Sequence, residues 1–238
     1  MAAFQTAEEL RKAPAYTLAE AAHYLRLPPS TVRAWCVGQR YFDARRNPRL
    51  FSPVIEIADR KAKGLSFINL VELFVLAAIR RKYEVGLPQV RQAVAYLKRK
   101  FPTPHPLADH EFQTNGVDLF AEKFGELLNL SREGQVEMKE LLRAHLRCVQ
   151  RDPAGVPIKL YLIPRNPRLD ITKRERGAVV IDPRFGFGRP VLDGTGIRTD
   201  VVVERFSAGE PLDALAEDYG RPKEDLEEVL RCELPLAA

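Results

Sequence analysis

The chain has 238 residues, of which 45% are hydrophobic and 29% are charged, and its net charge of +5 weakly favours a polyanionic partner. It contains no signal-peptide core and no run of about 18 apolar residues, which excludes a membrane-spanning helix. The three cysteines, Cys36, Cys148 and Cys232, are odd in number and widely spaced. We therefore expect reduced thiols in a cytoplasmic protein rather than a disulfide framework.

The segment Tyr16–Cys36 predicts two short helices joined by a tight turn. Apolar residues at i, i+3, i+4 and i+7 predict the first helix over 17–25, with Thr17 as its N-cap. Pro28 and Pro29 end that helix, because proline lacks a backbone N–H and disfavours helical geometry in the residue before it. Ser30 is expected to cap the second helix. The second helix is expected to bury Val32, Trp35 and Cys36 and to expose Ser30, Thr31, Arg33 and Ala34, which together describes a helix-turn-helix.

A basic segment and a β-hairpin are expected to follow. Residues 38–51 contain four arginines and one aspartate. Residues 53–57 alternate like a strand, and residues 65–67 supply its partner around a polar tip, Asp59–Gly64. Two short strands around a basic tip predict a wing beside the helix-turn-helix.

Residues 69–163 predict an α+β extension of this first domain, which then spans 1–163. Helices are expected over 69–83, from Pro88 to Phe101, and over 133–146. The Asn115-Gly116 pair predicts a hairpin turn between strands at 110–114 and 117–119. Two further strands, 148–151 and 158–163, flank turn chemistry at 152–155.

Residues 164–177 predict a linker, because they combine prolines and many charges with few large apolar side chains. A second module, 178–238, then begins with a strand at 178–181 and a glycine-rich stretch. Helices over 200–208, 211–219 and 223–232, with glycine stops, predict a small trihelical, homeodomain-like unit. The fold class is therefore α+β and mainly helical.

Charge separates the two modules. Residues 26–49 hold six basic residues and one acid, whereas residues 204–233 hold ten acids and four basic residues. DNA carries one negative charge per about 1.7 Å of its axis, and non-specific binding is nearly all phosphate neutralisation. The first module is therefore expected to bind DNA, and the acidic second module to bind a protein.

This division predicts two sets of site residues, and the alternative for the basic set is an ordinary solvated face. The DNA-binding residues are expected to be Tyr16, Thr17, Ser30, Thr31, Arg33, Arg40, Arg45, Arg46, Arg60, Lys61 and Lys63. The partner-binding residues are expected to be Glu217, Asp218, Glu224, Asp225 and Glu228.

Features typical of catalysis are sparse, so we predict no enzyme, no metal and no cofactor. His105, Asp109 and His110 could bind a metal, but a polar loop beside prolines is the simpler interpretation. The glycine-rich segments 186–188 and 194–196 lack the lysine and the strand–loop–helix context of a phosphate-binding loop. Turns that require positive φ explain them better.

Two family resemblances follow from these motifs. Residues 16–101, beginning YTLAEAAHYLRLPPSTVRAW, resemble the MerR-like winged helix, but no long dimerisation helix and no cysteine effector site follow. Residues 178–234 resemble the bacterial domain-of-unknown-function family 433, in which Gly188, Pro190, Gly194 and Thr195 match a Gly-x-Pro-x-x-x-Gly-Thr segment before three helices.

Proteins that join these two modules resemble VapB-type antitoxins of type II toxin–antitoxin systems. The resemblance implies a PIN-like ribonuclease toxin as partner, repression of the shared operon by DNA binding, and a homodimer. The alternatives are a stand-alone transcription regulator without a toxin and, from another class, an enzyme that uses the loop 186–196.

Overall fold

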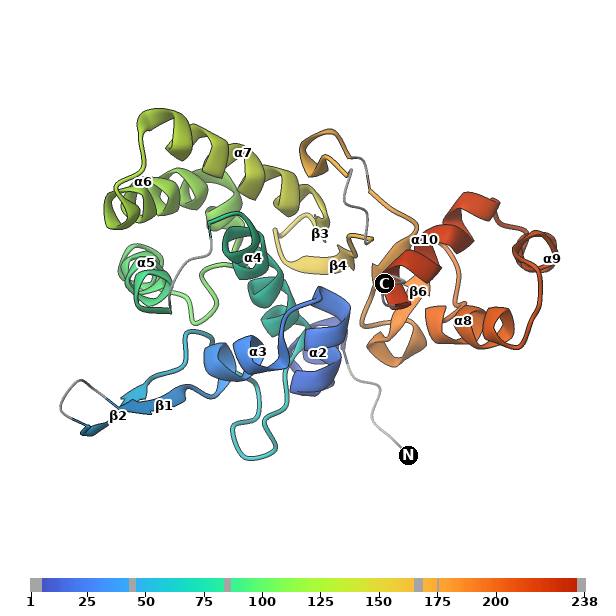
Figure 1. Ribbon diagram of the computed structural model, residues 1–238, viewed down its shortest axis with the longest axis horizontal. Helices are drawn as coiled ribbons and strands as arrows, with labels where there is room; N and C mark the ends of the chain where they lie inside the picture. The colour runs from blue at the N-terminus through green and yellow to red at the C-terminus, as the bar shows by residue number, and fades with distance from the viewer. Residues whose placement is uncertain (1–5, 43–45, 84–86, 165–168, 175, 235–238) are drawn as a thin grey trace.

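The computed structural model describes residues 6–42, 46–83, 87–164, 169–174 and 176–234 (Figure 1). A short helix, α1 (Ala7–Lys12), precedes the predicted pair α2 (Leu18–Leu25) and α3 (Pro29–Cys36). Thr17 begins α2 with a capping box, because its hydroxyl accepts from the Glu20 N–H and the Glu20 carboxylate accepts from the Thr17 N–H. The predicted helix-turn-helix is confirmed.

The second helix differs from the prediction at its start and on its outer face. Its N-cap is Pro28, which makes no side-chain hydrogen bond to the helix. Because the helix begins at Pro29, Ser30 lies inside it and does not cap it. A proline at the first helical position needs no such cap for its own nitrogen, because it has no N–H. Thr31 and Ala34 were expected to face outward and are buried instead.

The hairpin beside α3 lies earlier in the chain than predicted. Strands β1 (Gln39–Phe42) and β2 (Pro48–Phe51) pair antiparallel, with Arg40 opposite Leu50. The predicted strands at 53–57 and 65–67 are wrong, because residues 53–58 form no strand and residue 67 begins a helix. Asp59 and Gly64 form only an isolated bridge around a turn.

Four helices build the centre of the N-terminal part: α4 (Phe67–Tyr83), α5 (Leu87–Lys100), α6 (Val117–Leu128) and α7 (Arg132–Arg147). Helix α4 packs against α7, α6 packs against α5 and α7, and residues 67–79 of α4 are all buried. The predicted hairpin at 110–119 is wrong, since residues 112–116 form a π-helical turn that leads directly into α6. Burial of Phe112, Val117 and Phe120 in the core outweighs the turn preference of Asn115-Gly116.

One antiparallel sheet spans both parts of the chain, in the order β3–β4–β5–β6. Its strands are β3 (Val149–Arg151), β4 (Pro157–Tyr161), β5 (Val179–Ile181) and β6 (Pro190–Leu192). The segment predicted as a linker connects β4 to β5, which are neighbours, with Leu160 opposite Ile181. It contains a short 3-10 helix, η2 (Ile171–Lys173). The two modules therefore share a sheet, which lies between their helices in Figure 1.

Three helices follow the sheet: α8 (Thr199–Ser207), α9 (Leu212–Tyr219) and α10 (Lys223–Glu233). Helix α10 packs on α8, α9 and β5, and Val202, Leu215, Leu226 and Val229 are buried between them. Within the described residues, no helix combines the length and hydropathy that crossing a membrane requires.

Candidate nucleic-acid interface and its junction with the C-terminal part

Helix α3 presents a small polar face on a rigid support. Ser30 and Arg33 are exposed, whereas Trp35 is buried and its carbonyl accepts hydrogen bonds from the N–H groups of Val54 (2.8 Å) and Ile55 (3.1 Å). Within the described residues, Arg33 makes no ion pair. Arg33 can therefore reach a phosphate or a base edge without breaking an internal contact.

Two residues predicted to contact DNA are buried. Thr31 is 7% exposed and Tyr16 is 3% exposed. The Tyr16 ring lies against the loop at Gly188 in the C-terminal part, and burial raises the pKa of its hydroxyl. These two predictions were wrong because helical periodicity does not show what packs against a helix from a distant segment. Thr17 is exposed, but its hydroxyl is occupied in the α2 cap.

The hairpin β1–β2 adds exposed cations beside α3. Gly38 starts it at φ 91°, where an added Cβ would meet the Phe51 carbonyl oxygen at 2.3 Å, so only glycine fits. Arg40 and Arg46 are exposed, and neither forms an ion pair with the part of the chain that the structure describes. Arg45 lies outside the described residues. Figure 1 shows the hairpin extending from α3 away from the C-terminal helices.

The turn over 59–64 displays a second basic group. The Asp59 carboxylate accepts from the N–H groups of Lys61 (2.8 Å) and Ala62 (2.9 Å), which fixes the turn. Arg60, Lys61 and Lys63 are all exposed. The buried Asn69 anchors the base of the turn, because its Oδ1 accepts from Ala58 and Ser66. The sequence placed these cations correctly on a turn, although not on a wing.

Three arginines that the sequence analysis did not name as site residues lie around the end of α2. Arg26, Arg80 and Arg81 line a cavity of about 370 Å³ together with Leu27 and Pro28. The Arg81 guanidinium donates to the Leu25 carbonyl, and burial together with the charge of Arg26 lowers its pKa. The sequence signal for this basic cluster is the run Arg80-Arg81-Lys82, which places three consecutive cations in the last turn of α4.

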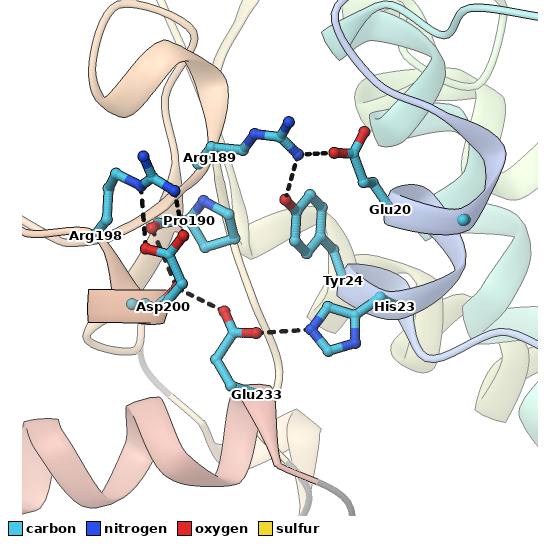
Figure 2. A pocket seen from close by; sticks show the side chains of 10 residues that line it. Glu20, His23, Tyr24, Arg189, Pro190, Arg198, Asp200 and Glu233 are labelled. Atoms are coloured by element: carbon cyan, nitrogen blue, oxygen red, sulfur yellow. Dashed lines mark hydrogen bonds and ion pairs between the residues drawn. The ribbon is translucent and has the colours of Figure 1, made fainter. Parts of the chain in front are cut away.

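The other side of α2 meets the C-terminal part (Figure 2). The Arg189 guanidinium pairs with the Glu20 carboxylate and donates to the Tyr24 hydroxyl at 3.0 Å. His23 Nε2 lies 2.6 Å from Glu233 Oε2, and the Thr199 hydroxyl donates to the other oxygen of Glu233 at 2.5 Å.

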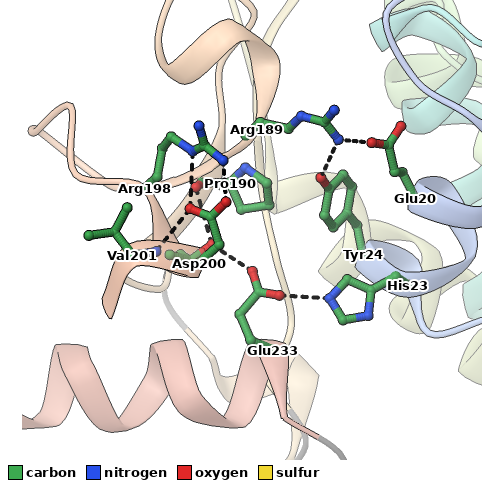
Figure 3. A network of polar contacts seen from close by, with 10 residues as sticks. Glu20, His23, Tyr24, Arg189, Pro190, Arg198, Asp200, Val201 and Glu233 are labelled. Carbon is green, nitrogen blue, oxygen red and sulfur yellow. Dashed lines mark hydrogen bonds and ion pairs between the residues drawn. The ribbon is translucent and has the colours of Figure 1, made fainter. Parts of the chain in front are cut away.

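This junction encloses a cleft of about 520 Å³ whose charged side chains are already paired. Figure 3 shows the network continuing to Arg198 and Asp200 at the start of α8. We therefore interpret the cleft as a structural joint between α2 and the C-terminal part.

The acidic residues predicted to bind a partner fall into two groups. Glu217 and Glu224 are exposed. Asp218 pairs with Arg205, and Asp225 pairs with Arg221 at 2.7 Å. Glu228 accepts from Arg174 at 2.8 Å and from the Ala178 N–H at 2.9 Å, and its side chain is only 16% exposed. The prediction for Glu228 was wrong, because this carboxylate holds the connecting segment onto α10.

All three cysteines are free and buried. Reduced thiols were predicted for all three, and burial was predicted for Cys36. Burial raises their pKa values to about 12, 11 and 12 for Cys36, Cys148 and Cys232. His105 lies 2.9 Å from the buried Glu72. Among the described residues, no three side chains of the metal-binding types come together to hold an ion.

Comparisons with known proteins agree with this arrangement. Residues 14–94 match the family described as "Putative DNA-binding HTH domain", and residues 179–231 match "Protein of unknown function (DUF433)". The chain is 31% identical to "Putative antitoxin VapB45" of Mycobacterium tuberculosis (strain ATCC 25618 / H37Rv), covering 97% of this chain and 98% of that protein. It is 23% identical to "Uncharacterized protein Rv2308" of the same strain, covering 90% and 88%.

A solved structure shows the same fold over nearly the whole length. The crystal structure of Rv2018 from Mycobacterium tuberculosis superposes with a TM-score of 0.65 at 26% identity, covering 92% of this chain and 98% of that one. The long, continuous match to VapB45 includes both the helix-turn-helix and the C-terminal module. The chain belongs to the VapB-type antitoxin family.

Proposed function

We propose that this chain is an antitoxin that binds a PIN-like ribonuclease toxin and represses its own operon by binding operator DNA. One observation carries the DNA-binding half of this proposal. Basic side chains lie exposed on α3, on the neighbouring hairpin and on the 59–64 turn, namely Arg33, Arg40, Arg46, Lys61 and Lys63. Exposed cations of this kind can neutralise phosphates.

In this proposal Arg33 and Ser30 enter the major groove, because they are the exposed polar side chains of the second helix. Arg40 and Arg46 on the hairpin and the basic turn over 59–64 contact the flanking backbone. Arg26, Arg80 and Arg81 provide a further phosphate site at the end of α2. We extend the proposal to a homodimer, whose recognition helices would require half-sites about 34–36 Å apart or a multiple of that distance.

The C-terminal part supplies the toxin-binding half, for which the family membership is the support. Helices α8–α10, which we interpret as a homeodomain-like trihelical unit, carry excess negative charge and would be repelled by DNA. Glu217 and Glu224 are free to face a partner protein. A regulator of this kind needs no catalytic group of its own.

Co-expression with the neighbouring gene tests this function. The product of an adjacent PIN-like reading frame should co-purify with this chain and lose its ribonuclease activity in the complex. The purified chain should also shift a DNA fragment of the operon's own promoter. Promoter binding without any capture of that product would instead identify a stand-alone regulator.

A further inference from the structure

The loop between β5 and β6, residues 182–189, displays an aromatic side chain in an unusual backbone conformation. Gly186, Phe187 and Gly188 have φ values of 55°, 55° and 76°. A bulky L-residue in this left-handed region costs free energy, and such strain concentrates at functional sites. Phe187 is nevertheless 92% exposed, so no burial within the chain offsets that cost.

The loop is held rigidly on both sides of Phe187. The buried Asp182 carboxylate accepts from the backbone N–H of Arg184 at 3.0 Å and from its guanidinium at 2.7 Å. A Cβ added at Gly186 would lie 2.8 Å from Val191 Cγ1, and one added at Gly188 would lie 2.6 Å from the Tyr16 hydroxyl oxygen. These close approaches fix the two glycines against the sheet and against the helix-turn-helix, and Phe187 projects between them.

The same loop borders a hollow through Asp182 and Phe185. A cavity of about 340 Å³ is lined by Phe185, which is 48% exposed, and by the buried Val180 and Val191. Its polar rim includes Asp193, which pairs with Lys159 at 2.7 Å. The loop therefore carries an exposed aromatic side chain, Phe187, and borders a partly apolar hollow through Phe185, a combination of features that a protein partner can contact.

The charges around the loop favour a protein over a nucleic acid. Each arginine near Phe187 has a carboxylate partner: Arg184 has Asp182, Arg189 has Glu20 and Arg198 has Asp200. A nucleic-acid site needs uncompensated positive charge to neutralise phosphates. Protein interfaces, in contrast, are commonly anchored by a few rigid aromatic side chains seated in pockets.

We propose that Phe187 is the anchor by which the C-terminal part binds its protein partner, with Phe185 and the adjacent hollow completing the contact. The inference rests on the proposed function, since the partner to which we assign this surface is the toxin. The toxin would carry an apolar socket for the phenyl ring and an apolar side chain that enters the hollow. Rigidity of the loop means that little order is lost on binding.

Replacement of Phe187 separates binding from folding. Asparagine tolerates positive φ better than phenylalanine does, so Phe187→Asn should keep or raise the melting temperature. It should weaken binding of the purified product of the adjacent PIN-like reading frame by about 30-fold or more, as expected for a hot spot. Phe187→Gly, which removes the backbone strain entirely, should give the same loss. Val136→Asn on α7, where the side chain is 52% exposed, is the matched control and should bind as the wild type does.

The outcomes distinguish this inference from the function on which it rests. If the wild type does not bind the product, the proposed function fails. If the wild type binds and both Phe187 variants bind equally well, the anchor is wrong. An effect of the variants confined to self-association would assign the loop to a second copy of the chain, and an effect confined to promoter binding would assign it to DNA. Either result would overturn the proposal.

Discussion

The arginines on and beside α3 differ from those of the C-terminal helices. Those of the C-terminal helices are held by nearby carboxylates, as Arg205 is by Glu210 and Asp218, and Arg221 by Asp225. Arg33 on α3 and Arg40 on the neighbouring hairpin have no such partner within the ranges that the structure describes. A count of charges shows which part is acidic, but only the pairing shows which charges are available to a ligand. Arg33 and Arg40 are available to a ligand, whereas many anions of the C-terminal part are already paired.

Among the substitutions that test this comparison, Glu228→Ala is expected to have the largest effect on the free energy of unfolding. Glu228→Ala leaves the Arg174 guanidinium, whose side chain is 11% exposed, and the Ala178 N–H without their acceptor. We expect the free energy of unfolding to fall by about 3 kcal/mol, because breaking a buried ion pair strands the remaining charge. Urea denaturation measures this loss.

Glu224→Ala, in the same helix, is the control for that experiment. Glu224 is exposed, so its removal should change the free energy of unfolding by less than about 0.5 kcal/mol. Equal effects of the two substitutions would mean that Glu228 has no structural role, and Glu228 would again be a candidate for binding a partner.

A pH dependence should arise from the N-terminal part. Burial lowers the pKa of His145 to about 4, against the opposing effect of its hydrogen bond to the Leu141 carbonyl. The folded state therefore binds this proton less readily than the unfolded state. Neutral His145 therefore leaves the free energy of unfolding at its full value above pH 6.5. As the pH falls towards 4, the free energy of unfolding decreases by up to about 1.4 kcal/mol per pH unit.

His145→Gln should flatten the stability profile between pH 6.5 and 4 when unfolding is followed at several pH values. His110→Gln, at an exposed site, is the control and should leave the slope unchanged. A wild-type profile that is flat in this range would show that His145 does not govern the acid sensitivity.

A smaller effect is expected where the two parts touch. Gly188→Ala adds a Cβ at φ 76° and places it 2.6 Å from the Tyr16 hydroxyl oxygen, so we expect a loss of about 1–3 kcal/mol. Tyr16→Phe removes that hydroxyl, which is buried and has no hydrogen-bond partner in the described part of the chain. Calorimetry should show that Tyr16→Phe is stabilising by about 1 kcal/mol or less and that it partly rescues Gly188→Ala. If the effects of Gly188→Ala and Tyr16→Phe on stability simply add, the contact between Gly188 and Tyr16 does not couple the N-terminal and C-terminal parts.

The smallest effect is expected at the basic turn. Lys61→Ala removes one exposed cation, and we expect it to weaken binding to all DNA sequences about equally and to reduce the salt slope of binding by about 1. Titrations of promoter and unrelated DNA at several salt concentrations measure this. An unchanged slope would remove the turn from the interface.

Local signals predicted much of this fold. The Thr17 N-cap, the proline stop after α2 and the glycine stop after α9 each depend on residues close in sequence, and the corresponding helix boundaries were predicted to within one or two residues. The hairpins were harder. Asn115-Gly116 favours a turn in isolation, but the aromatic residues on both sides are buried in the helical core, and that tertiary contact decides the structure.

The candidate site was predicted less completely, because exposure depends on distant segments. Arg33 stands on the face that periodicity indicated. Tyr16, however, is covered by the loop at Gly188, which is more than 170 residues away in the chain. The ion pair between Arg174 and Glu228 joins the segment that was predicted to be a linker to a carboxylate that was predicted to bind a partner.

The most direct test of the proposal that the N-terminal part binds DNA compares the loss of an unpaired arginine with the loss of a paired one. Arg33→Ala should weaken binding to the operon's own promoter by about 1–3 kcal/mol, because the exposed guanidinium is proposed to read a base. Arg221→Ala, in which the lost guanidinium is already bound to Asp225, should change promoter binding by less than about 0.5 kcal/mol. Equal losses, or no loss from Arg33→Ala, in quantitative gel shifts at one salt concentration would contradict the assignment of DNA binding to the N-terminal part.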